Sequence, residues 1–512
     1  MVKPLIRAAV AFFAAAAFAS LLTAACDAPN KAGDNGLAIT GVVADGYNQS
    51  SGYSATTKLT IWFNEDIHGL KADDIKLNAA FNILKHGFTR TGRAVYELSI
   101  TPGSSGPVMV GLDPYNLAGW KWKAIAVNVY AVFHFTGTTA LAITRYNGKD
   151  TEINIPEDIA GIPVTAVGDG VFNGRALTEI TIPNTIETIG RLAFANNELT
   201  GLVIPGGVKS IGAGAFTSNK LAGVDISDGV ASIGDEAFNY NQLESVTIPE
   251  SVTSIGRLAF ANNRLSAIII PDNVANIGQS AFQSNRLISV DIPKNVKTIA
   301  AGLFSHNMLK SVTIHDKVES IGAYAFDYNR LADITIPDSV ITIGNNAFAC
   351  NMLADVNLSQ GLESIGISAF AYNMLEDIAL PDSLKDIRDN AFENNNLTAV
   401  TIGDEVILIG KNAFANNLLQ NITIGNSVTS IGDYTFQNNQ LSGVIIPENV
   451  KFIGEYAFRG SQLTSITIGD DVSLGRDAFG DGFEILYNAF GKAAGVYTRD
   501  NPFSSWWHYD DI

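Results

Sequence analysis

The sequence predicts a mainly β protein in which a β-sandwich of about 100 residues precedes a long solenoid of stacked coils. Two observations carry this prediction. A 22-residue pattern recurs from Leu177 to Leu463, and several short runs of alternating apolar residues lie between residues 37 and 135. A fixed period of this length is typical of a leucine-rich-repeat solenoid, and short, regularly spaced strands are typical of a sandwich.

One unit of the repeat is Leu199–Lys220, with the sequence LTGLVIPGGVKSIGAGAFTSNK. Counting its first residue as position 1, apolar residues occupy positions 1, 4, 6, 10, 13, 17 and 18. Position 18 is phenylalanine in thirteen successive units, from Phe194 to Phe458, and outlying copies stand at Phe172 and Phe479. The chain therefore contains about fifteen coils, which we expect to form a right-handed solenoid.

Each part of the unit has its own expected conformation. Positions 3 to 6 alternate polar and β-branched residues, which predicts a strand whose positions 4 and 6 point inward and whose positions 3 and 5 point outward. Proline at position 7 ends this strand. The following segment returns along the other side, where glycine at position 14 permits a turn. Because no single unit can bury its own apolar residues, stacking of the units creates the core.

Asparagine occupies position 21 in twelve successive units and gives way only to Ser461. A buried amide side chain can satisfy the backbone groups of two neighbouring coils at once. We therefore expect a structural asparagine ladder rather than a ligand site, beginning with Asn197, Asn219, Asn241, Asn263 and Asn285.

The repeat resembles the BspA-like class of bacterial leucine-rich repeats, whose pattern is close to L-x-x-I-x-I-P-x-x-V-x-x-I-G-x-x-A-F-x-x-C/N. The resemblance covers about residues 138–512. It implies an exported or surface-exposed bacterial protein with a role in adhesion, coaggregation or contact with host molecules.

Residues 1–25 are expected to be a signal peptide, because Lys3 and Arg7 precede an apolar run that ends in Leu22-Thr-Ala-Ala-Cys26. This ending looks like a bacterial lipobox, which implies lipidation of Cys26 and anchoring at the cell envelope, on its outer surface. Ordinary cleavage after the small residues is the alternative. Residues 26–36 are small and polar and are expected to form a tether.

Residues 37–135 are expected to form the sandwich. The runs Lys58–Phe63, Ala94–Ile100 and Ala124–Tyr130 alternate apolar and polar residues between clusters of Gly, Pro and Asn. The segments Leu59–Ile67 and Val127–Tyr130 resemble bacterial Ig-like domains of surface proteins.

The solenoid is expected over residues 138–482, with an irregular N-terminal cap coil at 138–176 that carries an insertion at Ile159–Pro163. Residues 483–512 are expected to form the C-terminal cap. In this cap Phe483–Tyr487 and Ala494–Tyr497 would pair as a hairpin beside an aromatic tail. A sugar- or wall-binding aromatic patch is the alternative for this tail.

Composition and the absence of motifs argue against several classes of function. A net charge of −18 argues against nucleic acid as a partner. Two cysteines provide no disulfide framework, and the six scattered histidines form no metal-binding motif. We find no nucleophile, phosphate-binding or dinucleotide motif, so the sequence predicts a protein that is not an enzyme and has no catalytic, cofactor or metal residues.

The outward strand positions 3 and 5 define a face too long for a small-molecule site. Its candidate binding residues are acidic or hydroxylated, namely Asp225, Asp291, Asp333, Asp355, Asp377, Thr313 and Thr335. Asp333, Asp355 and Asp377 occupy position 3 of adjacent coils, which suggests either a strip that docks cations or Lys and Arg side chains, or a solvated acidic face.

The sequence therefore favours a lipid-anchored adhesion protein whose solenoid binds an extracellular protein or glycan of a host or neighbouring cell. The alternative is a structural envelope protein that associates with itself or with wall polysaccharide.

Overall fold

In the computed structural model, the described residues are 39–44, 47–48, 52–53, 58–63, 75–79, 83–92, 95–102, 106–112, 125–129, 133–159, 162–480, 482–502, 504 and 506–510. They belong to two compact units, one ending at Lys149 and including Asp158–Val164, the other comprising Asp150–Glu157 and Thr165 onward. The expected signal peptide, Cys26 and the tether lie outside the described residues.

The strands of the first unit form antiparallel sheets. One has the order β1 (Ile39–Ala44), β4 (Lys58–Phe63), β7 (Val95–Pro102) and β6 (Ile83–Gly92). Another has the order β5 (Ile75–Ala79), β8 (Gly106–Leu112) and β9 (Ile125–Val129), and β2 (Tyr47–Asn48) pairs with β3 (Gly52–Tyr53). Leu59, Ile61 and Leu98 are fully buried, as alternation in β4 and β7 requires. The Ig-like character of this unit stays a prediction.

The start of the solenoid differs from the expected cap coil. Strands β10 (Phe133–Thr136) and β11 (Leu141–Tyr146) form an antiparallel hairpin within the first unit. The insertion that we expected at Ile159–Pro163 forms a second hairpin, because β13 (Asp158–Ile159) pairs antiparallel with β14 (Ile162–Val167). The regular coils therefore begin with β12 (Glu152–Asn154).

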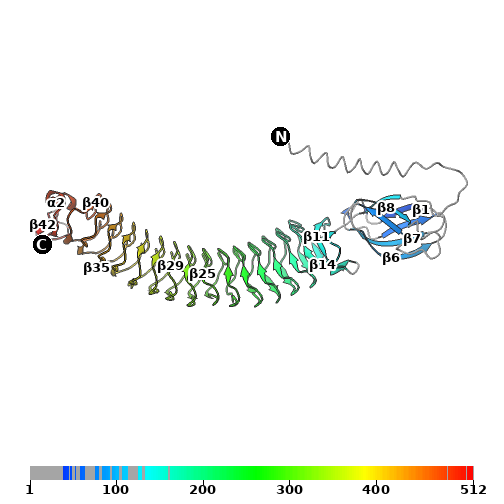
Figure 1. Cartoon of the computed structure of the whole chain (residues 1–512), viewed down its shortest axis with the longest axis horizontal. Coiled ribbons are helices and arrows are strands. Elements are labelled where there is room, and N and C mark those ends of the chain that lie inside the picture. Colours follow the sequence, from blue (N-terminus) through cyan, green and yellow to red (C-terminus); the bar gives the residue numbers. More distant parts are fainter. Residues whose placement is uncertain are drawn as a thin grey trace, which may run out of the picture. The chain divides into compact units, whose positions relative to one another are not determined.

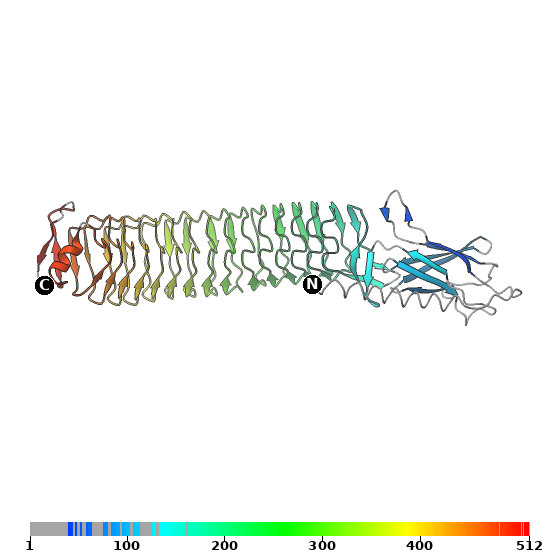
Figure 2. The ribbon, with the colours of Figure 1, turned by 90° about the horizontal axis from the view of Figure 1, so that it is seen from above.

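The second unit is a mainly β solenoid of about fifteen coils, and two rows of strands run along it (Figures 1 and 2). The first row contains the strands from positions 3 to 6. They are β12, β15 (Glu179–Thr181), β17 (Gly201–Ile204), β19 (Gly223–Ile226), β21 (Ser245–Thr247), β24 (Ser289–Asp291), β26 (Ser311–Thr313), β28 (Asp333–Thr335), β30 (Asp355–Asn357), β33 (Ala399–Thr401), β35 (Asn421–Thr423), β37 (Gly443–Ile445) and β39 (Ser465–Ile468).

The second row contains two-residue strands at positions 12 and 13, and it forms two long parallel ladders. One ladder runs from β14 through β16 (Thr188–Ile189), β18 (Ser210–Ile211), β20 (Ser232–Ile233) and β22 (Ser254–Ile255) to β23 (Asn276–Ile277). The other comprises β25 (Thr298–Ile299), β27 (Ser320–Ile321), β29 (Thr342–Ile343), β31 (Ser364–Ile365), β32 (Asp386–Ile387), β34 (Leu408–Ile409), β36 (Ser430–Ile431), β38 (Phe452–Ile453) and β40 (Ser473–Leu474).

The core is a column of stacked phenylalanine rings. The centroids of successive rings are 5.0 Å apart for Phe458 and Phe479 and 5.8 Å apart for Phe304 and Phe326, with interplanar angles of 4° and 12°. Both rows of strands pack their inward residues around these rings, and alternation such as exposed Val203 and buried Ile204 confirms the predicted orientation.

The asparagines at position 21 are buried and bridge neighbouring coils. Asn329 accepts a hydrogen bond from Leu309 N at 2.9 Å, and its Nδ2 donates to the carbonyls of Phe304 at 2.9 Å and Phe326 at 3.1 Å. The same pattern holds along the run, for example at Asn219 and Asn241. The amides therefore satisfy carbonyl and N–H groups that the Phe-rich turn would otherwise leave buried and unpaired.

Glycine at position 14 is required by a close approach between coils. A Cβ at Gly212 would lie 2.6 Å from the backbone carbons and oxygens of the preceding coil, and Gly344 is similarly crowded. The left-handed positions of the turn are instead 16 and 20, as at Leu258 (φ 55°) and Asn262 (φ 55°). The recurrence of asparagine at these two positions is the sequence signal for them, because asparagine tolerates this conformation.

The C-terminal cap contains a helix where we expected one strand of a hairpin, so that prediction was wrong. Residues Phe483–Ala489 form α2, and the buried Phe483 and Tyr487 lie one turn apart on its inner face. Strand β41 (Gly495–Thr498) pairs antiparallel with β39 and with β42 (His508–Asp510). These strands cover the open edge of the last coil, as a solenoid cap must.

Candidate functional site

The candidate site is the strand face, the surface formed by the outward positions 3 and 5 of the first row of strands. Parallel pairing brings the same position of neighbouring coils side by side, as for Val203, Asp225 and Thr247 in β17, β19 and β21. Each column therefore repeats at the strand spacing of about 4.8 Å. In the paired strands, an outward residue on this face therefore has its equivalent in the next coil as its register partner.

The structure brings some of the predicted residues together and separates others. Asp291 is the register partner of Thr313, and Asp333 is the register partner of Asp355. Thr335 lies in the same strand as Asp333, two residues further along the chain. All seven candidates are exposed, which is what a binding face requires: Asp225, Asp291, Thr313, Asp333, Thr335, Asp355 and Asp377.

The strand face also exposes aliphatic side chains that sequence reasoning did not single out. Val203 is 58% exposed, Ile269 is 84% exposed and Ile445 is 71% exposed, all at position 5. Their wide separation along the solenoid makes them single apolar points on a polar face rather than one patch.

The ladder of the strand face is interrupted, unlike that of the second row. Its strands form separate sheets of two or three, such as β24–β26, β28–β30 and β33–β35. Two coils, at residues 265–270 and 375–380, have no strand at these positions.

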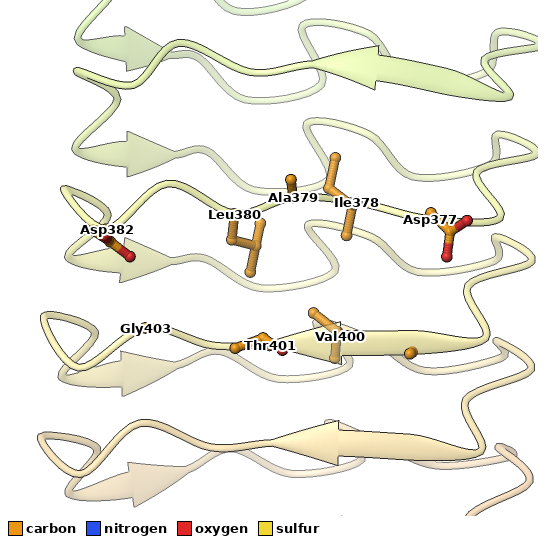
Figure 3. A pocket seen from close by; sticks show the side chains of 9 residues that line it. Asp377, Ile378, Ala379, Leu380, Asp382, Val400, Thr401 and Gly403 are labelled. Carbon is orange, nitrogen blue, oxygen red and sulfur yellow. The ribbon is translucent and has the colours of Figure 1, made fainter.

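Crevices lie on the strand face where neighbouring strands separate. One of about 450 Å³ lies between the coil of Asp377 and Ala379 and the next coil, with Ala399 and Thr401 on its other wall (Figure 3). Another of about 580 Å³ lies between β15 and β17. Both are lined by aliphatic residues, such as Ile378 and Leu202, together with polar residues, such as Thr401 and Thr178.

A second group of exposed side chains lies at the turn, at positions 16 and 20. Tyr240, Tyr328 and Tyr372 are between 55% and 61% exposed. The rings of His306 and Tyr328 stack with centroids 4.6 Å apart. A hydrogen bond with the thiol of Cys350 raises the pKa of the Tyr328 hydroxyl. Cys350 occupies position 20 between Tyr328 and Tyr372 of the adjacent coils and is a free cysteine.

The described residues contain no group of three or more His, Cys, Asp or Glu side chains that could hold a metal ion. Asp327 is a buried carboxylate of the coils. Burial raises its pKa, while a hydrogen bond with Ser305 and the nearby His306 act in the opposite direction. Its Oδ1 atom is buried without a hydrogen-bond partner among the described residues, which marks it as a packed turn residue. No helix in the described part of the chain is long and apolar enough to cross a bilayer.

The fold and this face define a leucine-rich-repeat protein with an extended, exposed strand face. A profile of the BspA type leucine-rich repeat region, in six copies, matches residues 165–289, 276–397 and 363–485. The chain therefore belongs to the BspA-type leucine-rich-repeat family. Relatives of this kind are repeat proteins with a non-enzymatic type of fold.

Three solved structures are similar to the chain over most of their own length. A leucine-rich repeat protein from Bacteroides ovatus is 23% identical, with a TM-score of 0.47 over 69% of this chain and 91% of that one. A leucine rich cell surface protein from Faecalibacterium prausnitzii is 27% identical, with a TM-score of 0.36 over 68% and 85%. The pneumococcal vaccine antigen PcpA is 21% identical, with a TM-score of 0.31 over 68% and 84%. No curated protein matches the chain.

Proposed function

We propose that this chain is a non-enzymatic surface protein that binds a macromolecule through its strand face. The observation that carries the proposal is the parallel register of the strand face, which stacks exposed Thr and Asp side chains from coil to coil. About fifteen coils at about 4.8 Å each give a face on the order of 70 Å long, far more than a small molecule contacts.

The chemistry of the face favours a polar partner such as an extracellular protein or a glycan. Hydroxyl groups at Thr313 and Thr335 both donate and accept hydrogen bonds, and aspartates accept them. The crevices add further hydroxyl groups, such as those of Thr401, Thr178 and Thr200. This arrangement suits many weak contacts along an extended partner, as in adhesion to a host or neighbouring cell.

Export and anchoring are part of the proposed role. The signal peptide of residues 1–25 would direct export, lipidation of Cys26 would anchor the chain at the outer surface, and the tether of residues 26–36 would follow. The sheets within residues 37–135 would form the Ig-like spacer. Labelling of whole cells with an antibody against the solenoid should succeed and be lost after external protease. Labelling only after permeabilisation would refute a surface location.

The binding role is tested by paired threonine substitutions. Thr313→Lys with Thr335→Lys places two large cations on the strand face, whereas Thr298→Lys with Thr342→Lys places the same residues on the second row of strands, where both threonines are also exposed. We expect only the first pair to reduce adherence of the protein to its target cells. Equal adherence of both variants would contradict binding by the strand face.

A structural envelope protein is the second candidate, and the exposed indole of Trp506 favours it. Trp506 is 80% exposed, whereas the neighbouring Trp507 is buried. Trp506→Ala should then reduce binding to purified wall polysaccharide. Deleting the whole tail is a poorer test, since β42 would be lost and the edge of β41 uncovered.

A further inference from the structure

The turn edge, defined as positions 22, 2 and 3 of each unit, is where the chain leaves the asparagine ladder and enters the strand. Over residues 264–377 its charges are separated by sign, whereas the preceding coils carry both signs, at Glu198, Lys220 and Glu244. Four cations come first, in successive turns, and four anions follow in three coils. The cationic block is Arg264, Arg286, Lys310 and Arg330, and the acidic block is Asp333, Asp355, Glu376 and Asp377.

None of these eight charged residues belongs to an ion pair of the described solenoid, and all eight are exposed. Other cationic side chains of the coils do form ion pairs, as Lys294 does with Asp272 at 2.8 Å. Within each block like charges lie in adjacent coils, and Asp333 and Asp355 are direct register partners. Like charges stacked in this way repel one another, so each block would be stabilised by a row of opposite charge.

Exposed apolar side chains lie along the same edge. Ile288 is 51% exposed, Met308 is 37% exposed, and Met352 and Met374 are each 50% exposed. Beside them at position 20, Tyr328 and Tyr372 adopt left-handed backbone conformations with φ of 50° and 57°, which disfavour large side chains. Tyrosine, methionine and arginine are the residues that protein interfaces enrich.

We propose that two copies of this chain pair in opposite directions along their turn edges, so that the cationic block of each faces the acidic block of the other. Both blocks follow the period of the coils, and their charges therefore share one spacing along the solenoid. A twofold axis near the boundary between Arg330 and Asp333 makes both contacts at once and closes the assembly as a dimer. The methionines and tyrosines provide apolar burial, and the charges fix orientation and register.

A second copy fits this edge better than an unrelated acidic partner. An acidic partner would satisfy the cationic block but would be repelled by Asp333, Asp355 and Asp377, which immediately follow it. Figure 3 shows Asp377 ahead of Ile378 and Ala379 along the chain, at one side of its coil. Only a surface with the same two blocks in reverse order matches both blocks of this edge.

Of the two outward positions of the strand face, the second copy covers only position 3. Its docking rests on the proposed function in one respect, that the aspartates of the strand face contact a binding partner. Position 5, with Thr313 and Thr335, remains available to another macromolecule. A monomeric wild type that still adheres through these threonines would therefore count against the dimer alone. A dimer whose adherence ignores the threonine substitutions would count against the proposed function alone.

The test is the oligomeric state of charge-reversed full-length protein, measured by analytical ultracentrifugation in low and high salt. One variant carries Arg264→Glu, Arg286→Glu and Lys310→Glu, and the other carries Asp333→Lys, Asp355→Lys and Asp377→Lys. We expect a wild-type dimer that salt dissociates. Each variant alone should associate at least about tenfold more weakly than the wild type. An equimolar mixture should recover the dimer, because all facing blocks are again opposite in charge.

The matched control reverses three exposed lysines away from the edge, with Lys209→Glu, Lys317→Glu and Lys451→Glu, and should dimerise like the wild type. Neutral versions with Gln and Asn at the same six edge positions should weaken association to a smaller extent. A monomeric wild type at all concentrations, or a dimer that persists in both reversed variants, would overturn the inference. Failure of the mixture to associate would overturn the antiparallel arrangement.

Discussion

At the residue scale, the asparagine of position 21 shows why the repeat tolerates so little change there. Its amide accepts one hydrogen bond and donates two to carbonyls of two coils, as Asn329 does. A serine hydroxyl has only one hydrogen to donate. At Ser461, which replaces asparagine in the last regular coil, the Oγ atom is buried without a hydrogen-bond partner among the described residues. The ladder therefore ends one coil before the cap.

We expect Ser461→Asn to stabilise the protein by about 1 kcal/mol, because the new amide would accept from Leu441 N and donate to the carbonyls of Phe436 and Phe458. Denaturant unfolding should show a higher midpoint. The control Ser442→Asn, at an exposed position of the same coil, should leave the midpoint unchanged. A midpoint for S461N at or below that of the wild type would contradict the ladder argument.

Asp327 predicts a pH-dependent effect. Burial raises the pKa of this carboxyl above its unfolded value, so its contribution to stability is fully present below about pH 3.9 and is lost as pH rises through the folded pKa. Asp327→Asn removes the charge and should stabilise the fold by about 1 kcal/mol at pH 7, with little gain near pH 3. Thermal unfolding of both proteins at the two pH values checks this. A stability difference between the two proteins that stays the same at both pH values would argue against it.

At the element scale, the cap shows where the sequence is ambiguous. Phe483-Glu-Ile-Leu-Tyr487 contains apolar residues both at alternate positions and four residues apart, so a strand and a helix both fit. The structure favours the helix because Phe483 and Tyr487 both reach the core, whereas Ile485 is 77% exposed. Glu484 supports the first turn by accepting a hydrogen bond from Phe479 N at 3.3 Å. Such tertiary contacts are absent from a single stretch of sequence.

The repeat itself was predictable because each position has the same surroundings in every coil. The inward strand positions, the phenylalanine column and the outward columns follow from the period alone. The interruptions of the strand face do not follow from it. Ser266-Ala-Ile-Ile-Ile270 fits the repeat as well as Gly201-Leu-Val-Ile204, yet only the latter forms a ladder. Pairing depends on the distance to the next coil, which the unit's own residues do not specify.

The C-terminal cap should detach from the last coil of the solenoid at alkaline pH. Burial raises the pKa of Tyr497 to about 12 and also raises that of Tyr487, whose hydroxyl donates to Gly469 O at 2.7 Å. The stabilising contribution of Tyr497 is therefore complete below about pH 10 and is lost as pH rises through about 12, and that of Tyr487 is likewise lost at alkaline pH. As pH rises, the absorbance of ionised tyrosine should increase together with loss of hydrogen-exchange protection of the cap amides. Tyr497→Phe should delay that loss, whereas Tyr240→Phe at an exposed turn should not.

At the scale of the whole solenoid, the second row of strands is divided at one joint. Ala300 stands at position 14, where most coils have glycine, and the ladder stops between β23 and β25 at this point. The crowding at Gly278 indicates why, since a Cβ there would approach the preceding backbone to 2.3 Å. Arg388 also replaces this glycine, yet its N–H still bonds Ile365 O at 3.2 Å, a longer bond than the 2.8 Å at Gly344.

Hydrogen exchange should reveal this joint. The amides of Lys209 and Gly212 bond to the preceding coil at 2.8 Å, whereas the equivalent bonds from Lys297 and Ala300 are missing within the described coils. We expect fast exchange at Lys297 and Ala300 between two protected blocks of coils. Gly344→Ala should create a second fast-exchanging site by the same crowding. Uniform protection across residues 290–305 would show that the ladder is continuous.

The equal spacing of the coils has a consequence for how such a chain changes length. Regular units offer their neighbours the same phenylalanine and, except at Ser461, the same asparagine, so removing or duplicating one whole unit between the two ends joins surfaces that already match. Length is then adjustable in single steps without redesigning any contact. The turn edge sets the one restriction, because a neutral coil added inside either charge block would interrupt its row. Growth outside Arg264–Asp377 would leave the pairing of two copies untouched.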